Sequence, residues 1–279
     1  PSSFGQGHGG EIRNGDPSGL RDLRRLIIYR TNCPLSVDAV TEIILVLFLS
    51  AALSTVAVRV KLLTPSGAVT ALAVGLVLGI AGSIYWLIAV LAFAVIGFMV
   101  TKLNLSEKKM KGLQEGRSGE RTGKNVLGVA LPGCMFALIN LYSGDKYYFI
   151  LSVGFIATIA VAAADTVASE LGTKDKNVWM ITTFERVLPG TDGGISLLGT
   201  LLSLMGSAVA VLLGWTVIFG LSFDALMIIP LLAGFIGCLL DSLLGATLET
   251  EGRITKYFNN MSTGLMGGII AVIFVGILG

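Results

Sequence analysis

Long apolar stretches recur along the chain from about residue 40 to its end, and the polar residues gather in a few segments between them. Each stretch is roughly 17–25 residues long, the length that an α-helix needs to cross a bilayer. The pattern predicts about eight spans, with seven to nine compatible with it: 40–58, 66–82, 84–101, 127–143, 148–172, 196–220, 224–249 and 262–279. The expected fold class is therefore all-α, a polytopic transmembrane helical bundle.

The composition supports a membrane protein and excludes several other classes. The mean hydropathy of +0.81 leaves too little polar surface for a soluble domain of 279 residues. A net charge of only +2 argues against a nucleic-acid partner. The three cysteines lack CxxC or Cys/His spacing, and His8 is the one histidine, so neither a disulfide framework nor a zinc site is expected.

The polar segments divide the chain into two parts. Residues 1–35 form a polar, glycine-rich extension with no signal-peptide pattern, and part of its start is expected to derive from cloning, since it lacks an initiator Met. Residues 36–279 are expected to form a single transmembrane catalytic domain, with polar loops at 102–126, 173–195 and 250–261.

Charge placement predicts the orientation of the spans. With eight spans, the connections after the first, third, fifth and seventh share one side. That side carries Arg59, Lys61, Lys102, Lys108, Lys109, Lys111, Arg117, Arg121, Lys124, Lys174, Lys176, Arg186, Arg253 and Lys256, whereas the other has Lys146. The positive-inside rule makes the loop-rich side cytoplasmic. Five arginines of the N-terminal extension disagree, and an interfacial or re-entrant segment there would reconcile them.

Two aspartates lie in the interior of predicted spans, away from the span ends. Asp165 is in the fifth span and Asp241 in the seventh, each followed within two turns by a glutamate, Glu170 or Glu249. A carboxylate within the bilayer is costly, so it usually faces protein or water. Capping or pairing with loop cations is the simpler interpretation, but two aspartates at similar depth favour a site. Paired oxygen ligands suit Mg²⁺, with phosphates and water completing its shell.

Small residues surround both aspartates at helical spacing. Around Asp165 these include Ala162, Ala168 and Ser169, and around Asp241 they include Gly234 and Gly237. Such faces either pack closely against another helix or leave room for a ligand, and the sequence leaves both alternatives open.

The segment 181–200 is rich in glycine and hydroxyl residues and leads directly into the sixth span. Gly190, Gly193 and Gly194 allow tight turns that present backbone N–H groups, with Thr191 and Ser196 beside them. Such a loop before a helix N-terminus suits an anion. The alternative is an ordinary turn in which Thr191 or Asp192 caps the helix.

The segment 115–125 superficially resembles a P-loop but departs from its spacing. Ser118 stands where the first glycine is required, Asn125 replaces the Ser/Thr, and no strand precedes it. Contact with anionic lipid and contact with substrate remain alternatives for this loop. Arg121, Lys124 and Asn125 lie beside the fourth span and are the candidates for phosphate contact.

Several motifs together resemble a known family. Ala164–Gly172, Ile181–Thr183, Pro189–Ser196 with Gly199, and Asp241–Glu249 are similar to the integral-membrane family labelled "domain of unknown function 92", over about residues 40–279. That family includes the plant chloroplast phytyl-phosphate kinase of vitamin E biosynthesis. A looser similarity reaches CTP-dependent dolichol and phytol kinases, which share the Asp165-x-x-Ala168-x-x-x-Gly172 spacing.

The resemblance implies phosphoryl transfer from CTP, or another nucleoside triphosphate, to a prenyl monophosphate such as phytyl or geranylgeranyl phosphate. It implies a multi-pass protein of a prokaryotic cell membrane or chloroplast envelope. Asp165 and Asp241 would hold Mg²⁺ and act with Arg186 in catalysis, and the prenyl tail would lie against the small-residue faces. The expected substrate-binding residues are Arg121, Lys124, Asn125, Ser169, Glu170, Lys174, Thr182, Thr183, Gly190, Thr191, Asp192, Gly193, Gly194, Ser196, Glu249 and Asn260.

Other functions share some of these features. Intramembrane acids and glycine-rich helices also occur in transporters, although a carrier places its charges nearer the midplane. A cytidylyltransferase that makes a CDP-lipid would use a similar site but release pyrophosphate. A non-enzymatic scaffold is a third alternative, and a homodimer is compatible with the sequence.

Overall fold

The computed structural model describes residues 39–110, 120–144 and 146–278. Eight helices in this part are long and apolar enough to span a membrane, so the predicted helical membrane bundle is confirmed. The helices are α2 (Ala39–Arg59), α3 (Pro65–Val77) with η1 (Leu78–Gly82), α4 (Ile84–Met110), α5 (Gly123–Ser143), α6 (Tyr148–Leu171) with η2 (Gly172–Lys174), α7 (Leu197–Phe219), η3 (Ala225–Met227) with α8 (Ile228–Leu244) and η4 (Gly245–Glu249), and α9 (Lys256–Leu278). The prediction for residues 1–35 lies outside the described residues.

The helix boundaries differ most from the predicted spans in α4 and α9. Helix α4 continues beyond residue 101 to Met110, and α9 begins at Lys256 rather than near residue 262. Hydropathy marks only the apolar part of a helix, whereas backbone hydrogen bonding continues through the polar turns at its end. As a result, Asn259 and Asn260 belong to a helix instead of a loop.

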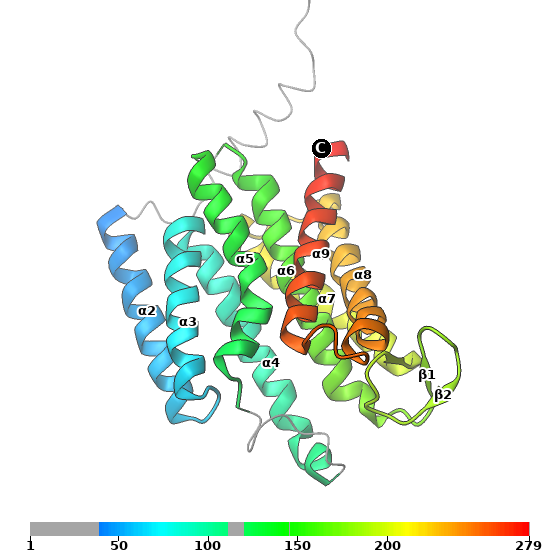
Figure 1. Cartoon of the computed structure of the whole chain (residues 1–279). Coiled ribbons are helices and arrows are strands. Elements are labelled where there is room, and N and C mark those ends of the chain that lie inside the picture. The colour runs from blue at the N-terminus through cyan, green and yellow to red at the C-terminus, as the bar shows by residue number, and fades with distance from the viewer. Residues whose placement is uncertain (1–38, 111–119, 145, 279) are drawn as a thin grey trace, which may run out of the picture. The chain divides into compact units, whose positions relative to one another are not determined.

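Helix α6 is the central element of the bundle. Most of its residues are buried, and it packs against α4, α5, α7, α8 and α9 (Figure 1). Small residues make this close packing possible, because a Cβ at Gly206 of α7 would lie 2.8 Å from the carbonyl oxygen of Ala163. At the other end of α6, Trp86 stacks on Phe155 and donates a hydrogen bond to Ser152.

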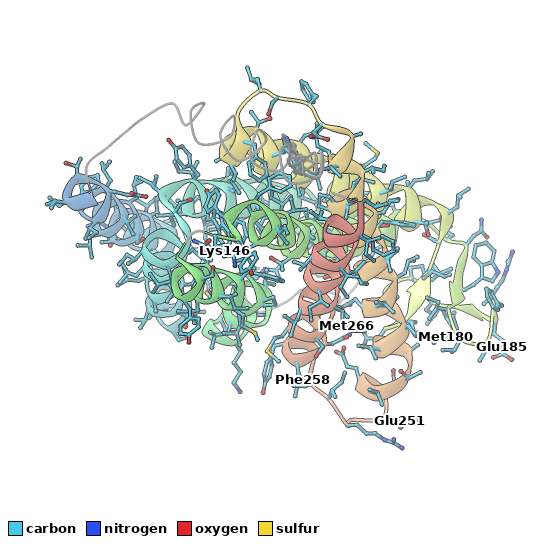
Figure 2. The ribbon with its side chains drawn as sticks, turned by 90° about the horizontal axis from the view of Figure 1, so that it is seen from above. Lys146, Met180, Glu185, Glu251, Phe258 and Met266 are labelled. Carbon is cyan, nitrogen blue, oxygen red and sulfur yellow. The ribbon has the colours of Figure 1, made fainter. Side chains whose placement is uncertain are left out.

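The connection between α6 and α7 contains a small sheet that the hydropathy pattern did not predict. Strands β1 (Val178–Met180), β2 (Arg186–Val187) and β3 (Gly194–Ile195) are antiparallel in the order β2-β1-β3. Strands of two or three residues are too short for an alternating pattern to be recognised. Figure 2 shows Met180 and Glu185 on this segment, at the edge of the bundle beyond α8.

The connections after the first, third, fifth and seventh spans, which follow α2, α4, α6 and η4, meet at one end of the bundle, as the topology prediction requires. The α2–α3 turn pairs with the segment before α5 through Leu63 and Arg121, and Gly193 of the α6–α7 segment lies against Ala246 after α8 (Figure 1). We call this end the loop end. Its cytoplasmic orientation remains a prediction.

Candidate active site

A polar cavity of about 220 Å³ opens at the loop end. Helix α6, the β-strand segment, the start of α7, the end of α8 and the start of α9 contribute to its wall. Its described lining includes five carboxylates and two cationic side chains: Asp165, Glu170, Asp192, Asp241, Glu249, Arg121 and Lys256. So acidic a cavity among membrane-spanning helices costs stability, which indicates a functional role.

The two predicted intramembrane aspartates face this cavity from different helices. Asp165 extends from α6 and Asp241 from α8, and their carboxylates interact electrostatically. Oδ1 of Asp241 accepts a hydrogen bond from Thr263 at 3.2 Å. In the amide orientation that satisfies its neighbours, Asn260 also donates to this oxygen, at 3.3 Å. Packing of α9 against α8 therefore orients one of the two carboxylates.

Asn259 connects the ends of α8 and α9. Its buried side-chain amide donates to the main-chain carbonyl of Asp241 and to Oε2 of Glu249, both at 3.1 Å. Among the described residues its Oδ1 atom has no hydrogen-bond partner, although the residue borders the cavity. Glu249 also interacts electrostatically with Asp192 and Lys256, so three elements converge on this wall.

Arg121 supplies a cationic group from a neighbouring connection. Its backbone N–H donates to Leu62 and its carbonyl accepts from Thr64, at 2.9 and 3.1 Å, which fixes the chain before α5 begins. Its guanidinium lies 3.8 Å from Oε1 of the buried Glu170, which also accepts a hydrogen bond from Thr101. An anion at this side of the cavity would compete with Glu170 for the guanidinium.

The glycine-rich segment forms another side of the cavity. Gly190 and Gly193 have positive φ angles of 87° and 77°, and a Cβ at Gly193 would lie 2.3 Å from Cβ of Ala246. A side chain there would be strained by the backbone conformation and would collide with the end of α8. The N–H of Gly194 donates to Thr191 within the segment, so the turn itself uses one of the amides expected to bind phosphate.

Ser196 caps α7, in place of the Thr191 or Asp192 considered from the sequence. Its hydroxyl accepts from the N–H of Gly199 at 3.0 Å. Asp175 reinforces this helix start, since its carboxylate accepts from the N–H groups of Asn177 at 2.9 Å and Leu198 at 3.4 Å. The hydrogen bond from Asn177, with that from Leu198, lowers the pKa of Asp175.

The structure brings most of the predicted site residues together and places others elsewhere. The cavity is bordered by Asp165, Asp241, Arg121, Ser169, Glu170, Gly190, Thr191, Asp192, Gly193, Gly194, Ser196 and Glu249. Asn260 lies beside it through Asp241. Arg186, Lys124, Asn125, Lys174, Thr182 and Thr183 are not among its lining residues.

Local contacts explain the residues that lie away from the cavity. Arg186 is on β2, with its guanidinium 5.9 Å from the ring of Trp179. Lys124 is exposed over Tyr257, and the side chain of Asn125 accepts from the N–H of Thr122 as part of a capping box. The strand pairing that carries Arg186 was not visible in the sequence, so the role proposed for this residue lacks support from its position.

Lys256, Asn259 and Thr263 are cavity or wall residues outside the predicted set of site residues. They repeat every three or four residues at the start of α9 and therefore share one helix face. That spacing was the available signal, but the polar turns of α9 were assigned to a loop. Among the described residues, no group of three or more His, Cys, Asp or Glu side chains is arranged to hold a metal ion alone.

Comparison with known proteins places this arrangement in a family. The profile of the integral membrane protein family DUF92 matches residues 48–276, which include all eight spans in whole or part. The chain belongs to the DUF92 family. The family resemblance expected from the motifs is thereby confirmed, and every described residue that lines the polar cavity lies within the matched range.

Three relatives show the range of the family. An uncharacterized membrane protein of Synechocystis is 34% identical over 76% of this chain and 82% of its own length. One from Methanocaldococcus jannaschii is 37% identical over 67% of this chain and 75% of its own. The chloroplastic protein VTE6 of Arabidopsis thaliana is 30% identical, over 66% of this chain and 56% of VTE6. No solved structure matches the chain.

Proposed function

We propose that this protein is a membrane-embedded lipid-phosphate kinase. It transfers a phosphoryl group from CTP, or another nucleoside triphosphate, to an isoprenoid monophosphate such as phytyl or geranylgeranyl phosphate. The acidic cavity at the loop end carries the proposal, because it combines paired intramembrane carboxylates, a glycine-rich turn and cationic groups in one wall. The similarity to VTE6 supports an isoprenoid acceptor, as does the Asp165–Gly172 spacing that the chain shares with dolichol and phytol kinases.

The excess of carboxylates bears on whether Mg²⁺ fits this cavity. Five carboxylates against two cations would repel a triphosphate unless a cation accompanies it. Asp165 and Asp241 offer hard oxygen donors from two facing helices, the donor type that Mg²⁺ prefers with phosphates completing its shell. The residues therefore fit, and bound Mg²⁺ would neutralise phosphate charge between the two substrates.

The remaining residues have roles in binding and orientation. Arg121 and Lys256 would each pair with phosphate oxygens, while Thr263 and Asn260 hold the carboxylate of Asp241 towards the cavity. An oxygen of the acceptor phosphate attacks the γ-phosphorus, the bond to the β–γ bridging oxygen breaks, and a nucleoside diphosphate leaves. The acceptor is already anionic, so this chemistry depends on positioning and charge neutralisation more than on a base.

The depth of the site distinguishes this proposal from transport. Asp165 lies six residues before the end of α6, and Asp241 lies eight residues before the end of η4. Both are within about 12 Å of the loop end along their helices, at 1.5 Å per residue. Such a position suits a reaction between an aqueous nucleotide and a lipid whose headgroup lies at the membrane surface. We place this end at the cytoplasmic face.

A product assay tests the proposal. The purified protein in nanodiscs is mixed with Mg²⁺, γ-labelled CTP or ATP, and phytyl or geranylgeranyl phosphate. A kinase yields a labelled prenyl diphosphate and a nucleoside diphosphate. Release of pyrophosphate with formation of a CDP-lipid would instead identify a cytidylyltransferase. No turnover with any of the four substrate pairs would contradict the proposal, provided that the protein is shown to be folded by its thermal transition.

A further inference from the structure

A second cavity, also of about 220 Å³, lies between α4, α6 and α7. Each helix lines it with one face, as shown by the spacing of three or four residues in Ala89, Phe93 and Gly97 of α4 and in Ala163, Thr166 and Val167 of α6. Among its described lining residues, Thr166 carries the one hydroxyl and the rest are apolar. We call it the apolar groove.

The groove follows the helices into the membrane. Its lining on α7 runs from Leu202 to Leu213, which corresponds to about 16 Å at 1.5 Å per residue. Met205 and Val209 line it and are also exposed on the bundle surface, so the groove opens sideways towards lipid.

The apolar groove adjoins the polar cavity. Thr166 borders both, and on α7 Leu202 lines the groove while the next residue, Ser203, lines the polar cavity. Asp165, one residue before Thr166, faces the polar side. A single molecule with a polar head and one apolar chain would thus meet both surfaces.

Gly97 has free space around it, unlike the closely packed glycines. Among the described residues, a Cβ at Gly97 would meet Thr166 and Phe93 alone, at the ordinary distances of 3.7 and 3.9 Å. At Gly234 and Gly237, by contrast, a Cβ would lie 2.4 and 2.3 Å from neighbouring side chains. Packing therefore explains those two glycines but not Gly97, where alanine would fit and favour the helix by about 1 kcal/mol.

These contacts also correct the expected position of the prenyl tail. The small-residue faces around the two aspartates were expected to receive it, but Gly234 and Gly237 are filled by α6 and α7 side chains, including Ser207 and Val161. Free space lies instead on the opposite side of Asp165, between α4, α6 and α7.

We propose that the apolar groove holds the hydrocarbon chain of the lipid monophosphate acceptor. Gly97 and Thr166 lie where the groove meets the polar cavity that holds the headgroup. This inference rests on the proposed function for the identity of the headgroup. The chain is already in an apolar medium before it binds, so the groove contributes close packing and orientation instead of hydrophobic burial. It would align this chain and hold its phosphate beside Asp165.

Filling the groove at Gly97 tests this inference. In Gly97→Leu the side chain occupies the groove where it meets the polar cavity, and we expect KM for geranylgeranyl phosphate to rise about tenfold or more, the usual effect of misfitting methylenes in a pocket. With dimethylallyl phosphate, whose chain is too short to extend along the groove, the change should be much smaller. Gly97→Ala should have an intermediate effect, and it provides a second variant if Gly97→Leu does not fold.

Ala94→Leu is a matched control, because it adds bulk to the exposed face of the same helix, away from the groove. We expect it to leave both KM values unchanged. Equal KM values for wild type, Gly97→Ala and Gly97→Leu would overturn the groove as the chain site.

Photo-crosslinking provides a test that does not depend on turnover. Geranylgeranyl phosphate with a diazirine at the distal end of its chain should label α4 and α7 near Ala89 and Leu213, the groove residues farthest from the polar cavity, and Gly97→Leu should lose this labelling. Labelling without turnover would reject the kinase reaction and keep the groove. Turnover with labelling confined to α8 and α9 would reject the groove and keep the kinase.

Discussion

The side-chain amide of Asn259 donates a hydrogen bond to Oε2 of Glu249 across the turn between α8 and α9, at 3.1 Å. The same amide donates to the main-chain carbonyl of Asp241, so one buried side chain connects the two acidic residues that α8 and η4 contribute to the polar cavity. A buried amide with two such acceptors is costly to remove, because each acceptor then lacks a donor. Asn259 is therefore expected to hold the wall of this cavity in shape.

Asn259→Ala is predicted to lower the free energy of unfolding by about 1–3 kcal/mol and to reduce activity. The measurement is denaturant unfolding in mild detergent, combined with the product assay. Ser262→Ala is the control, because among the described residues the Ser262 hydroxyl donates to Phe258 alone, one turn earlier in α9. Its loss should change stability by about 0.5 kcal/mol or less. Equal stability of the two variants would contradict the role assigned to Asn259.

Asp165→Asn and Asp241→Asn are each predicted to reduce turnover by about 100-fold or more, since each removes a charged oxygen donor from the cavity. Without Mg²⁺, neither variant should melt below wild type, because each relieves the repulsion between two neighbouring carboxylates. With Mg²⁺ and nucleotide, wild type should gain thermal stability and the variants should not. Full turnover in both variants would remove the proposed metal site.

Gly193→Ala is predicted to impair both folding and activity. At φ 77° an alanine costs about 1–2 kcal/mol, and its Cβ would also overlap Ala246 beside the cavity. Gly144→Ala is a matched control, because Gly144 also has a left-handed backbone, with φ 61° and ψ 50°, but no described residue comes within 4 Å of a Cβ there. The difference between their unfolding free energies measures the contact with Ala246. If the two variants lose equal stability and Gly193→Ala keeps full activity, the segment does not need this close approach.

Asp175 should make the loop end sensitive to acid. Its hydrogen bond from Asn177 lowers its pKa from the ordinary value of 3.8, so the carboxylate stabilises the fold above that pH. The contribution is lost as the pH falls through the lowered pKa of the folded protein. The difference in melting temperature between wild type and Asp175→Asn should accordingly be constant at neutral pH and shrink below about pH 4. A difference that stays unchanged to pH 2 would contradict this assignment.

The sequence alone was sufficient to predict the eight spans and the helices that carry the two aspartates. Each apolar stretch had to become a helix, since lipid offers no partner for backbone N–H and C=O groups. The cost of a charge in lipid then required Asp165 and Asp241 to face protein or water. These conclusions depend on length and composition, which any sequence displays directly.

Only the tertiary structure decided which residues accompany the aspartates. Arg121 borders the cavity and Lys124 does not, although they are only three positions apart. The backbone hydrogen bonds of Arg121 with Leu62 and Thr64 set the path of the chain before α5 and thereby place Arg121 at the cavity. Likewise, Gly234 and Gly237 of α8 pack closely against α6 and α7, so the free space lies on the other side of α6, which faces Gly97 of α4. Helix rotation and loop path result from contacts between segments far apart in sequence, so no local pattern encodes them.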